Sequence, residues 1–231
     1  MTDITTGKTS SLKVVYSFFG PPGTGKGTVA REAVEQLGFT MISTGEMLRA
    51  EVASNSDLGI LVKETITRGA LVSDEIVTKI VVNGLRKCQT TAFILDGYPR
   101  TASQARTFLD LFPKLFPGVE LKVVHFNLTD EEICRRLSAR LICKNKACQK
   151  TFSLISRKPK IDGICDHCAD SLMRRSDDAD AIVLERLEEY QKHALQVLAV
   201  YIEYKINISR LDLYGKNEEA VFSEFVLKCG T

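Results

Sequence analysis

The residues best suited to chemistry form the glycine-rich run Gly-Pro-Pro-Gly-Thr-Gly-Lys-Gly-Thr at positions 20–28. An apolar stretch precedes this run and a segment with helical spacing follows it, which is the setting of a phosphate-binding loop. Glycines allow positive φ angles, so backbone N–H groups at the start of a helix can surround a phosphate. A glycine-rich turn that binds nothing is the alternative. The run predicts a nucleoside triphosphate site formed by Gly23, Thr24, Gly25, Lys26, Gly27 and Thr28.

Three side chains have distinct expected roles around those phosphates. Lys26 would reach the β- and γ-phosphates, and Thr28 would hold Mg²⁺. Asp96 stands at the end of a later apolar stretch, 91–95, where a carboxylate could organise the same Mg²⁺ through water. The loop predicts the donor nucleotide but does not identify the acceptor.

Two short motifs near the ends of expected strands could form the acceptor side. The first motif, at residues 43–49, contains Thr44. The alternative to an acceptor-binding role for Thr44 is that it forms the N-cap of the following helix. In the second, Gly97 and Pro99 predict a tight turn that aims Arg100 into a cleft, with an ordinary turn as the alternative. Each motif alone is a weak signal.

Four of the seven cysteines are grouped as Cys143-x₄-Cys148-x₁₆-Cys165-x₂-Cys168. Two pairs of thiolates separated by a loop can complete the tetrahedral coordination that structural Zn²⁺ prefers. His167 is a possible substitute ligand, although its position inside the short turn disfavours it. Four reduced thiols without metal are the alternative. A Cys₄ set leaves no open coordination position, so we predict a structural zinc rather than a catalytic one.

The elements that must position these residues alternate between apolar runs and helical patterns. Strands are predicted at 13–19, 39–42, 91–95, 121–127 and 206–211. Helices are predicted at 26–37, 44–54, 57–67, 73–87, 101–111, 129–142, 177–205 and 217–228. This alternation predicts an α/β fold with a doubly wound, parallel five-stranded sheet, whose ligands bind at the carboxyl ends of the strands. Residues 44–72 and 142–175 do not fit the alternation, so we interpret them as insertions that could cover the cleft.

The composition of the 231 residues excludes several classes of protein. A net charge of +2 gives no support for a nucleic-acid or acidic-membrane surface. No apolar run is long enough to span a membrane, and the start of the chain lacks a secretory h-region. Seven cysteines without an export signal indicate reduced thiols or a metal site. We expect a cytoplasmic protein, with an organelle not excluded.

In this order, the motifs closely resemble those of the adenylate kinase family of nucleoside monophosphate kinases. The resemblance extends from about residue 13 to 228 and rests on the motifs at 20–28, 43–49, 69–74, 96–104 and 172–178. It implies the reaction ATP + AMP ⇌ 2 ADP with Mg²⁺, and we expect a monomer. It also implies a phosphate-loop core at 1–42, 73–138 and 179–231, a monophosphate-binding insertion at 43–72 and a lid at 139–178.

The resemblance also assigns roles to individual residues. AMP would contact Thr44, Arg49, Ala70, Val72, Gly97, Arg100, Gln104, Arg175 and Arg186. ATP would contact the phosphate loop together with Arg136 and Arg140. The groups expected to act on the transferred phosphoryl are Lys26, Arg100, Arg140, Arg175 and Arg186. Such a set is physically reasonable because phosphoryl transfer needs positioning and neutralisation, and guanidinium groups bind phosphate oxygens in bidentate fashion.

The chain departs from the usual family pattern at Val29, Tyr98, Ala139 and Leu141. Ala139 in place of a frequent glycine would stiffen the lid hinge modestly. The alternative functions are a kinase for another nucleoside monophosphate, an AMP kinase that uses GTP, and a zinc-bearing nucleotide sensor or nucleic-acid module. Thr44 favours AMP as acceptor, and the intact Lys26 and arginines disfavour an inactive scaffold.

Overall fold

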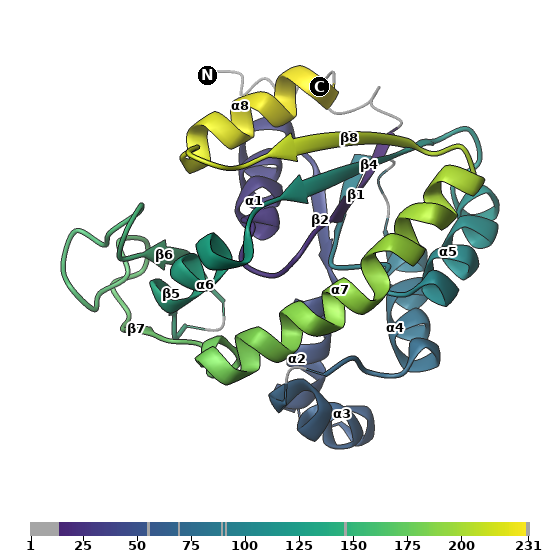
Figure 1. The fold of residues 1–231 in the computed structure, drawn as a ribbon. Coiled ribbons are helices and arrows are strands. Elements are labelled where there is room, and N and C mark those ends of the chain that lie inside the picture. The colour runs from purple at the N-terminus through teal and green to yellow at the C-terminus, as the bar shows by residue number, and fades with distance from the viewer. Residues whose placement is uncertain are drawn as a thin grey trace, which may run out of the picture.

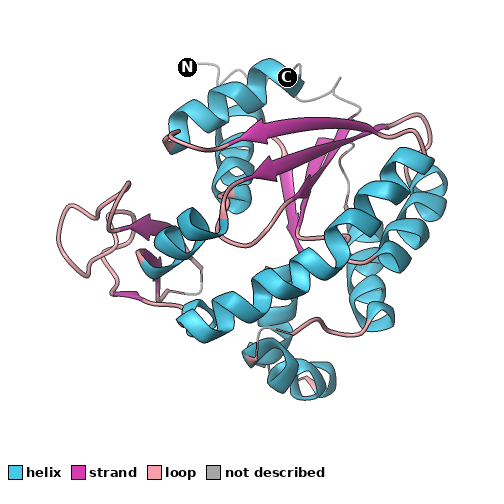
Figure 2. Ribbon diagram, viewed as in Figure 1, coloured by secondary structure: helices cyan, strands magenta, loops and turns pink. Residues whose placement is uncertain are grey.

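A central parallel sheet organises the chain in the computed structural model, which describes residues 14–54, 56–68, 70–88, 90, 92–145 and 147–229. Its strand order is β2-β3-β1-β4-β8. All pairings within this sheet are parallel, which confirms the predicted doubly wound α/β fold (Figures 1 and 2). The strands are β1 (Val14–Phe19), β2 (Thr40–Ser43), β3 (Ala92–Asp96), β4 (Glu120–Asn127) and β8 (Asn207–Asp212).

Helices cover both faces of the sheet because the central strand is apolar on both sides. Tyr16 and Phe18 of β1 pack with residues of the helices α1 (Lys26–Leu37) and α8 (Glu218–Cys229). Val15 and Phe19 point to the opposite face, as alternation along a strand requires. That face is covered by α4 (Asp74–Lys87), α5 (Ala102–Leu115) and α7 (Asp180–Glu203) (Figure 1).

Two insertions extend from this core. The first consists of α2 (Thr44–Ser54) and α3 (Asp57–Thr67), which pack against each other. The second follows α6 (Asp130–Ser138) and contains the short strands β5 (Arg140–Cys143), β6 (Thr151–Ser153) and β7 (Leu172–Met173). These form a separate antiparallel sheet in the order β6-β5-β7, which projects from one side of the molecule (Figure 1). We call this second insertion the lid.

The element boundaries differ from the prediction by three residues or more at three places. The helix predicted at 129–142 ends at Ser138, because Arg140, Leu141 and Ile142 pair with β6 instead. The helix predicted at 101–111 continues to Leu115 past Pro113, since its buried stripe continues through Phe112. The long helix predicted from residue 177 begins at Asp180, after a 3₁₀ turn at Ser176–Asp178.

The expected first residues of two strands, Lys13 and Thr91, lie outside the described residues, as does Gly69 of the motif at 69–74. No helix in the described ranges is long and apolar enough to cross a bilayer.

Candidate active site

A cleft of about 680 Å³ opens where β1 and β3 end, at the carboxyl edge of the parallel sheet. Its walls come from three parts of the chain: the core, the start of α2, and the lid residues around Phe152. The six arginines expected from the sequence all line it: Arg49, Arg100, Arg136, Arg140, Arg175 and Arg186. The fold therefore brings together cationic groups from distant segments of the chain.

The phosphate loop forms one wall of the cleft. Gly25, with a φ of 89°, precedes α1, and its carbonyl accepts the N–H groups of Thr28 and Val29 at 3.0 Å. Gly23 has a φ of 80°, and a Cβ there would lie 2.8 Å from Cγ of Leu137. A residue other than glycine is disfavoured at Gly25 because of the positive φ angle. At Gly23 it is disfavoured both by the positive φ angle and by the contact with Leu137. The first two N–H groups of α1, those of Lys26 and Gly27, come before these bonded ones, and N–H groups at the start of a helix are suited to bind an anion.

Lys26 is folded back into this loop. Its Nζ donates hydrogen bonds to the carbonyls of Gly20 at 2.8 Å and Pro21 at 2.7 Å, and to Thr24 Oγ1 at 3.2 Å. The pKa of Lys26 is lowered to about 8, mainly by burial; Asp96 opposes this decrease and Arg100 contributes to it. A phosphate at this position would supply the anionic partner that these neutral oxygens do not.

Thr28 and Asp96 both border the cleft, as the predicted magnesium site requires. Asp96 ends β3, and its Oδ2 would lie 3.5 Å from a Cβ placed on Gly27, which brings the carboxylate close to the start of α1. Hydroxyl and carboxylate oxygens are suitable ligands for Mg²⁺, which usually retains several waters.

Three of the arginines are held by two adjacent carboxylates. The carboxylate of Asp177 accepts two hydrogen bonds from the guanidinium of Arg175, one from Nε at 2.9 Å and one from Nη2 at 2.7 Å. Asp178, whose side chain is 2% exposed, accepts both Nε and Nη2 of Arg140, with Nε at 2.7 Å. Arg186 lies between the two carboxylates, with Nη1 at 3.4 Å from Asp177 and 3.5 Å from Asp178. These pairs keep the guanidinium groups together despite their mutual repulsion.

The pKa values of these groups reflect both burial and neighbouring charge. Burial alone raises the pKa of Asp177, but Arg175 and Arg186 outweigh this effect and lower it to about 2. Burial lowers the pKa of Arg186 to about 10, and Arg140 and Arg175 contribute to the decrease. Burial and Arg175 likewise lower the pKa of Arg49 to about 10. These arginines remain charged at neutral pH, and the cleft is therefore strongly attractive to anions.

A smaller pocket of about 70 Å³ adjoins the cleft beneath α2 and α3. Most of the residues expected to contact AMP line it: Thr44, Arg49, Ala70, Val72, Arg100, Gln104 and Arg186. Thr44 begins α2, and its buried Oγ1 has no hydrogen-bond partner among the described residues. The N-cap alternative is thus wrong for Thr44, because it is Ser43 Oγ that accepts the Glu46 N–H, at 3.4 Å.

Gln104 is fixed at the edge of this pocket by polar contacts at both ends. Its Oε1 accepts the Arg100 N–H at 2.8 Å, and its Nε2 donates to Asp74 at 2.8 Å. Asp74 also accepts the Thr101 hydroxyl at 2.7 Å. Arg100 Nε donates to the carbonyl of Gly97 at 2.9 Å, so the expected turn does present this arginine to the cleft.

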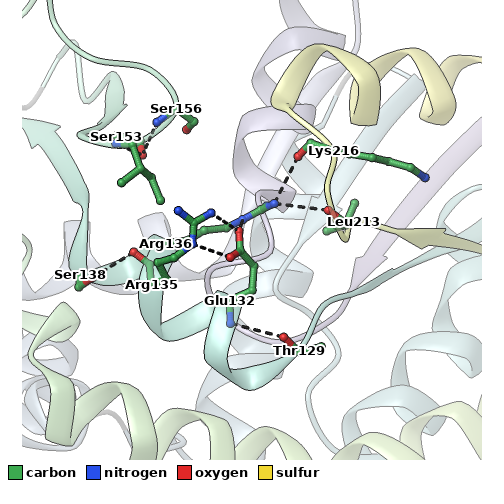
Figure 3. A network of polar contacts seen from close by, with 10 residues as sticks. Thr129, Glu132, Arg135, Arg136, Ser138, Ser153, Ser156, Leu213 and Lys216 are labelled. Atoms are coloured by element: carbon green, nitrogen blue, oxygen red, sulfur yellow. Dashed lines mark hydrogen bonds and ion pairs between the residues drawn. The ribbon is translucent and has the colours of Figure 1, made fainter.

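Arg136 lines the cleft away from the smaller pocket, and a network of hydrogen bonds and ion pairs holds its side chain (Figure 3). Glu132 accepts Arg136 Nε at 2.9 Å and also accepts two hydrogen bonds from Arg135. The other end of Arg136 donates to the carbonyls of Leu213 and Lys216, both at 3.4 Å, in the loop before α8 (Figure 3). The Arg135 hydrogen bond is the main cause of the decrease in the Glu132 pKa to about 2.

The four predicted metal ligands meet in the lid. The Sγ atoms of Cys143, Cys148, Cys165 and Cys168 all lie within 4.8 Å of one another. The four-residue spacing in the first pair therefore does not prevent convergence. The four thiols, which come from two turns, form the donor set that tetrahedral Zn²⁺ takes.

The parallel sheet, the phosphate loop and the arginine-lined cleft define a phosphate-loop protein of the nucleotide kinase type. The adenylate kinase family profile matches residues 18–206. The chain is 43% identical over 187 residues to an adenylate kinase of Thermosipho melanesiensis, covering 80% of this chain and 85% of the relative. It is 34% identical over 213 residues to an adenylate kinase of Methanosarcina acetivorans, covering 90% and 97%. The chain belongs to the adenylate kinase family and is a nucleoside monophosphate kinase.

The sequence did not assign the acidic partners of the site. Asp177 and Asp178, at the start of the helix predicted at 177–205, hold arginines. Asp74 and Glu132 were not assigned a role. For Asp177 and Asp178, the available sequence signal is the run of two arginines and two aspartates at 174–178, in which opposite charges stand close together.

Proposed function

We propose that the cleft binds MgATP against the phosphate loop and AMP in the smaller pocket, and that it catalyses ATP + AMP ⇌ 2 ADP. An oxygen of the AMP phosphate would form the new bond to the γ-phosphorus. The bond from that phosphorus to the β,γ-bridging oxygen would break, and its electron pair would leave with ADP. The attacking phosphate is already anionic, so the reaction needs neither a general base nor a protein nucleophile.

The donor assignment rests on the phosphate loop and Arg136. Lys26 would exchange its carbonyl partners for the β- and γ-phosphates, because anionic oxygens are stronger acceptors. Arg136 would lie near the adenine, since its guanidinium is anchored beside the loop before α8. The glycines of residues 23–27 would contribute backbone N–H groups.

The buried Thr44 hydroxyl is the observation that carries the acceptor assignment. An unpaired polar atom in a pocket is costly unless a ligand completes it. An adenine nitrogen could do so, while Arg49 and Arg100 hold the phosphate. The backbone of Ala70 and Val72 and the turn at Gly97 complete the wall, and Gln104 supports it.

Transfer would depend on neutralisation by groups from both sides of the cleft. Lys26 would follow the moving phosphoryl group, while Arg100, Arg140, Arg175 and Arg186 bind its oxygens and those of the flanking phosphates. Loss of one such arginine is expected to slow turnover by roughly 10³-fold if it acts as an arginine finger does.

We propose two metals with different tasks. Thr28 and Asp96 would hold Mg²⁺, which neutralises phosphate charge when it is bound with ATP. Cys143, Cys148, Cys165 and Cys168 would hold a structural Zn²⁺ that stabilises the lid. The donor sets fit these ions, because Mg²⁺ prefers oxygen ligands and Zn²⁺ takes thiolates.

The two insertions, proposed at 43–72 and 139–178, would move during turnover. The smaller pocket has a volume of about 70 Å³, well below the several hundred Å³ of typical ligand sites. Helices α2 and α3 would therefore have to open to admit AMP. Closure would then exclude water that could hydrolyse ATP.

We further propose that the enzyme is monomeric and cytoplasmic. One chain supplies every group assigned to the site, so no partner subunit is required. Sedimentation at equilibrium tests the first point, and imaging of a tagged protein in its native cell tests the second.

Turnover assays across acceptor and donor bases test the reaction. AMP with ATP should be the fastest pair, and Lys26→Ala should abolish phosphoryl transfer. Thr44→Ala should reduce kcat/KM for AMP while the KM for ATP stays unchanged. Faster turnover of UMP or CMP would refute the acceptor assignment, and faster turnover with GTP would refute the donor assignment.

A further inference from the structure

One arginine in the cleft wall contacts both insertions, and the proposed mechanism does not use it. Arg31 lies on α1, one turn beyond the phosphate loop. Its Nη2 lies 2.7 Å from Oε1 of Glu46 at the start of α2. Its Nη1 donates to Thr151 Oγ1 in β6 of the lid at 3.3 Å. A single guanidinium on the core therefore joins the AMP-side insertion to the lid.

A second contact places the lid at the same stretch of α1. Glu35, one helical turn after Arg31, forms an ion pair with Lys150, the residue before Thr151. Residues four apart lie on the same face of a helix, so Arg31 and Glu35 both face the lid. Only Arg31 also reaches the other insertion.

The surroundings of Arg31 differ from those of the arginines at the smaller pocket. Arg49, Arg100 and Arg186 line both the cleft and the smaller pocket, whereas Arg31, like Arg140 and Arg175, borders the cleft alone. Glu46 already neutralises its charge, and its side chain is 27% exposed. Its two Nη atoms point to two different elements, which a planar fork can contact simultaneously and an ammonium cannot in the same way.

We propose that Arg31 is a positioning residue that couples closure of the lid to closure of the AMP-side insertion. Both contacts can exist only when each cover lies against α1. A nucleotide that closes one cover therefore fixes the guanidinium in the orientation that the other cover needs. This inference rests on the proposed assignment of ATP to the lid side and AMP to the side of α2 and α3.

Coupling of this kind has a thermodynamic consequence. If ATP increases the affinity for AMP by a given factor, AMP increases the affinity for ATP by the same factor. Partly exposed ion pairs contribute modestly, so Arg31 should account for a factor of about three to five.

The test measures equilibrium binding of AMP to the full-length protein by calorimetry, with and without a saturating non-hydrolysable ATP analogue. The ratio of the two dissociation constants gives the coupling factor. Arg31→Ala should reduce this factor about three- to fivefold, while each nucleotide measured alone binds within about twofold of the wild type. Arg31→Lys should reduce it too, because the ammonium keeps the charge but not the fork.

Single-arm variants distinguish coupling from a general loss of structure. Glu46→Gln weakens only the contact to α2, and Thr151→Val removes only the contact to the lid. Each should reduce the coupling factor about as much as Arg31→Ala, and combining either with Arg31→Ala should add nothing. Glu35→Gln is the matched control on α1, because it weakens lid docking without touching the other insertion, and it should leave most of the coupling intact.

Several results would overturn the inference. An unchanged coupling factor in Arg31→Ala would exclude the role. A loss of tenfold or more in the affinity for one nucleotide measured alone would show instead that Arg31 binds phosphate directly. Failure of the proposed function is distinguishable, because the wild type would then fail to bind or turn over AMP and ATP at all.

Discussion

Replacing Asp177 with asparagine tests whether its charge holds the arginines of the cleft in place. The side chain is 17% exposed and accepts Arg175 in bidentate fashion. The folded protein lowers its pKa from 3.8 to about 2. One pKa unit corresponds to about 1.4 kcal/mol, so the ionised carboxylate contributes about 2 kcal/mol to the free energy of unfolding at neutral pH.

The direction of the pH dependence follows from this decrease. A carboxylate with a lower pKa in the folded state stabilises the protein above the unfolded value, and this contribution is lost as the pH falls from about 4 to about 2. Urea unfolding of the wild type and Asp177→Asn should therefore differ by about 2 kcal/mol at pH 7, and the difference should shrink progressively below about pH 4.

The control for this experiment is Asp162→Asn, which removes an exposed lid carboxylate. It should change the free energy of unfolding by less than about 0.5 kcal/mol. A difference between Asp177→Asn and wild type that stays constant down to about pH 3, or one below about 0.5 kcal/mol at neutral pH, would contradict the charge argument.

The other predictions concern the phosphate loop and the lid. Lys26 loses its proton as the pH rises through about 8, so ATP affinity should fall by up to about tenfold per pH unit above that value. In Lys26→Met, binding should be weaker and independent of pH over this range, and wild-type binding that is constant to about pH 10 would exclude the assignment. Cys168→Ser should lower the zinc content and accelerate amide exchange in the lid, with the core unaffected, because the described buried cluster of the lid comprises only Cys143, Phe152 and Cys165. Cys134→Ser, outside the cluster, should change neither quantity, and an unaltered lid in metal-free protein would disprove the structural role.

The core of the fold could be predicted from the sequence because its signals are local and repeated. Apolar strands alternate with helical patterns, and the glycine-rich loop stands between the first strand and helix. The position of Lys26 and the convergence of the four cysteines follow from such patterns.

The lid could not be predicted in the same way. Its strands are two to four residues long, and cross-strand contacts hold them in place more than any periodic pattern. Residues 139–142 continue the helical spacing of α6, so pairing with β6 was needed to identify Arg140 as part of a strand. The partners of the arginines depend on tertiary contacts too, since Asp178 lies 38 positions from Arg140 along the chain.

The attachment of the lid makes it an exchangeable module. Two segments far apart in the sequence meet at the base of the lid, where Arg174 Nη2 contacts the carbonyl of Ser138. Just beyond, Ile142 pairs with Met173. Because the two ends already meet, the length of the segment between them has little effect on the core, and each doubling of such a loop costs only about 0.6 kcal/mol of closure entropy. A shorter segment without cysteines could be grafted between Ile142 and Met173 without altering the parallel sheet or removing Arg140, so the length of the lid and its proposed metal site can change while the nucleotide core stays the same.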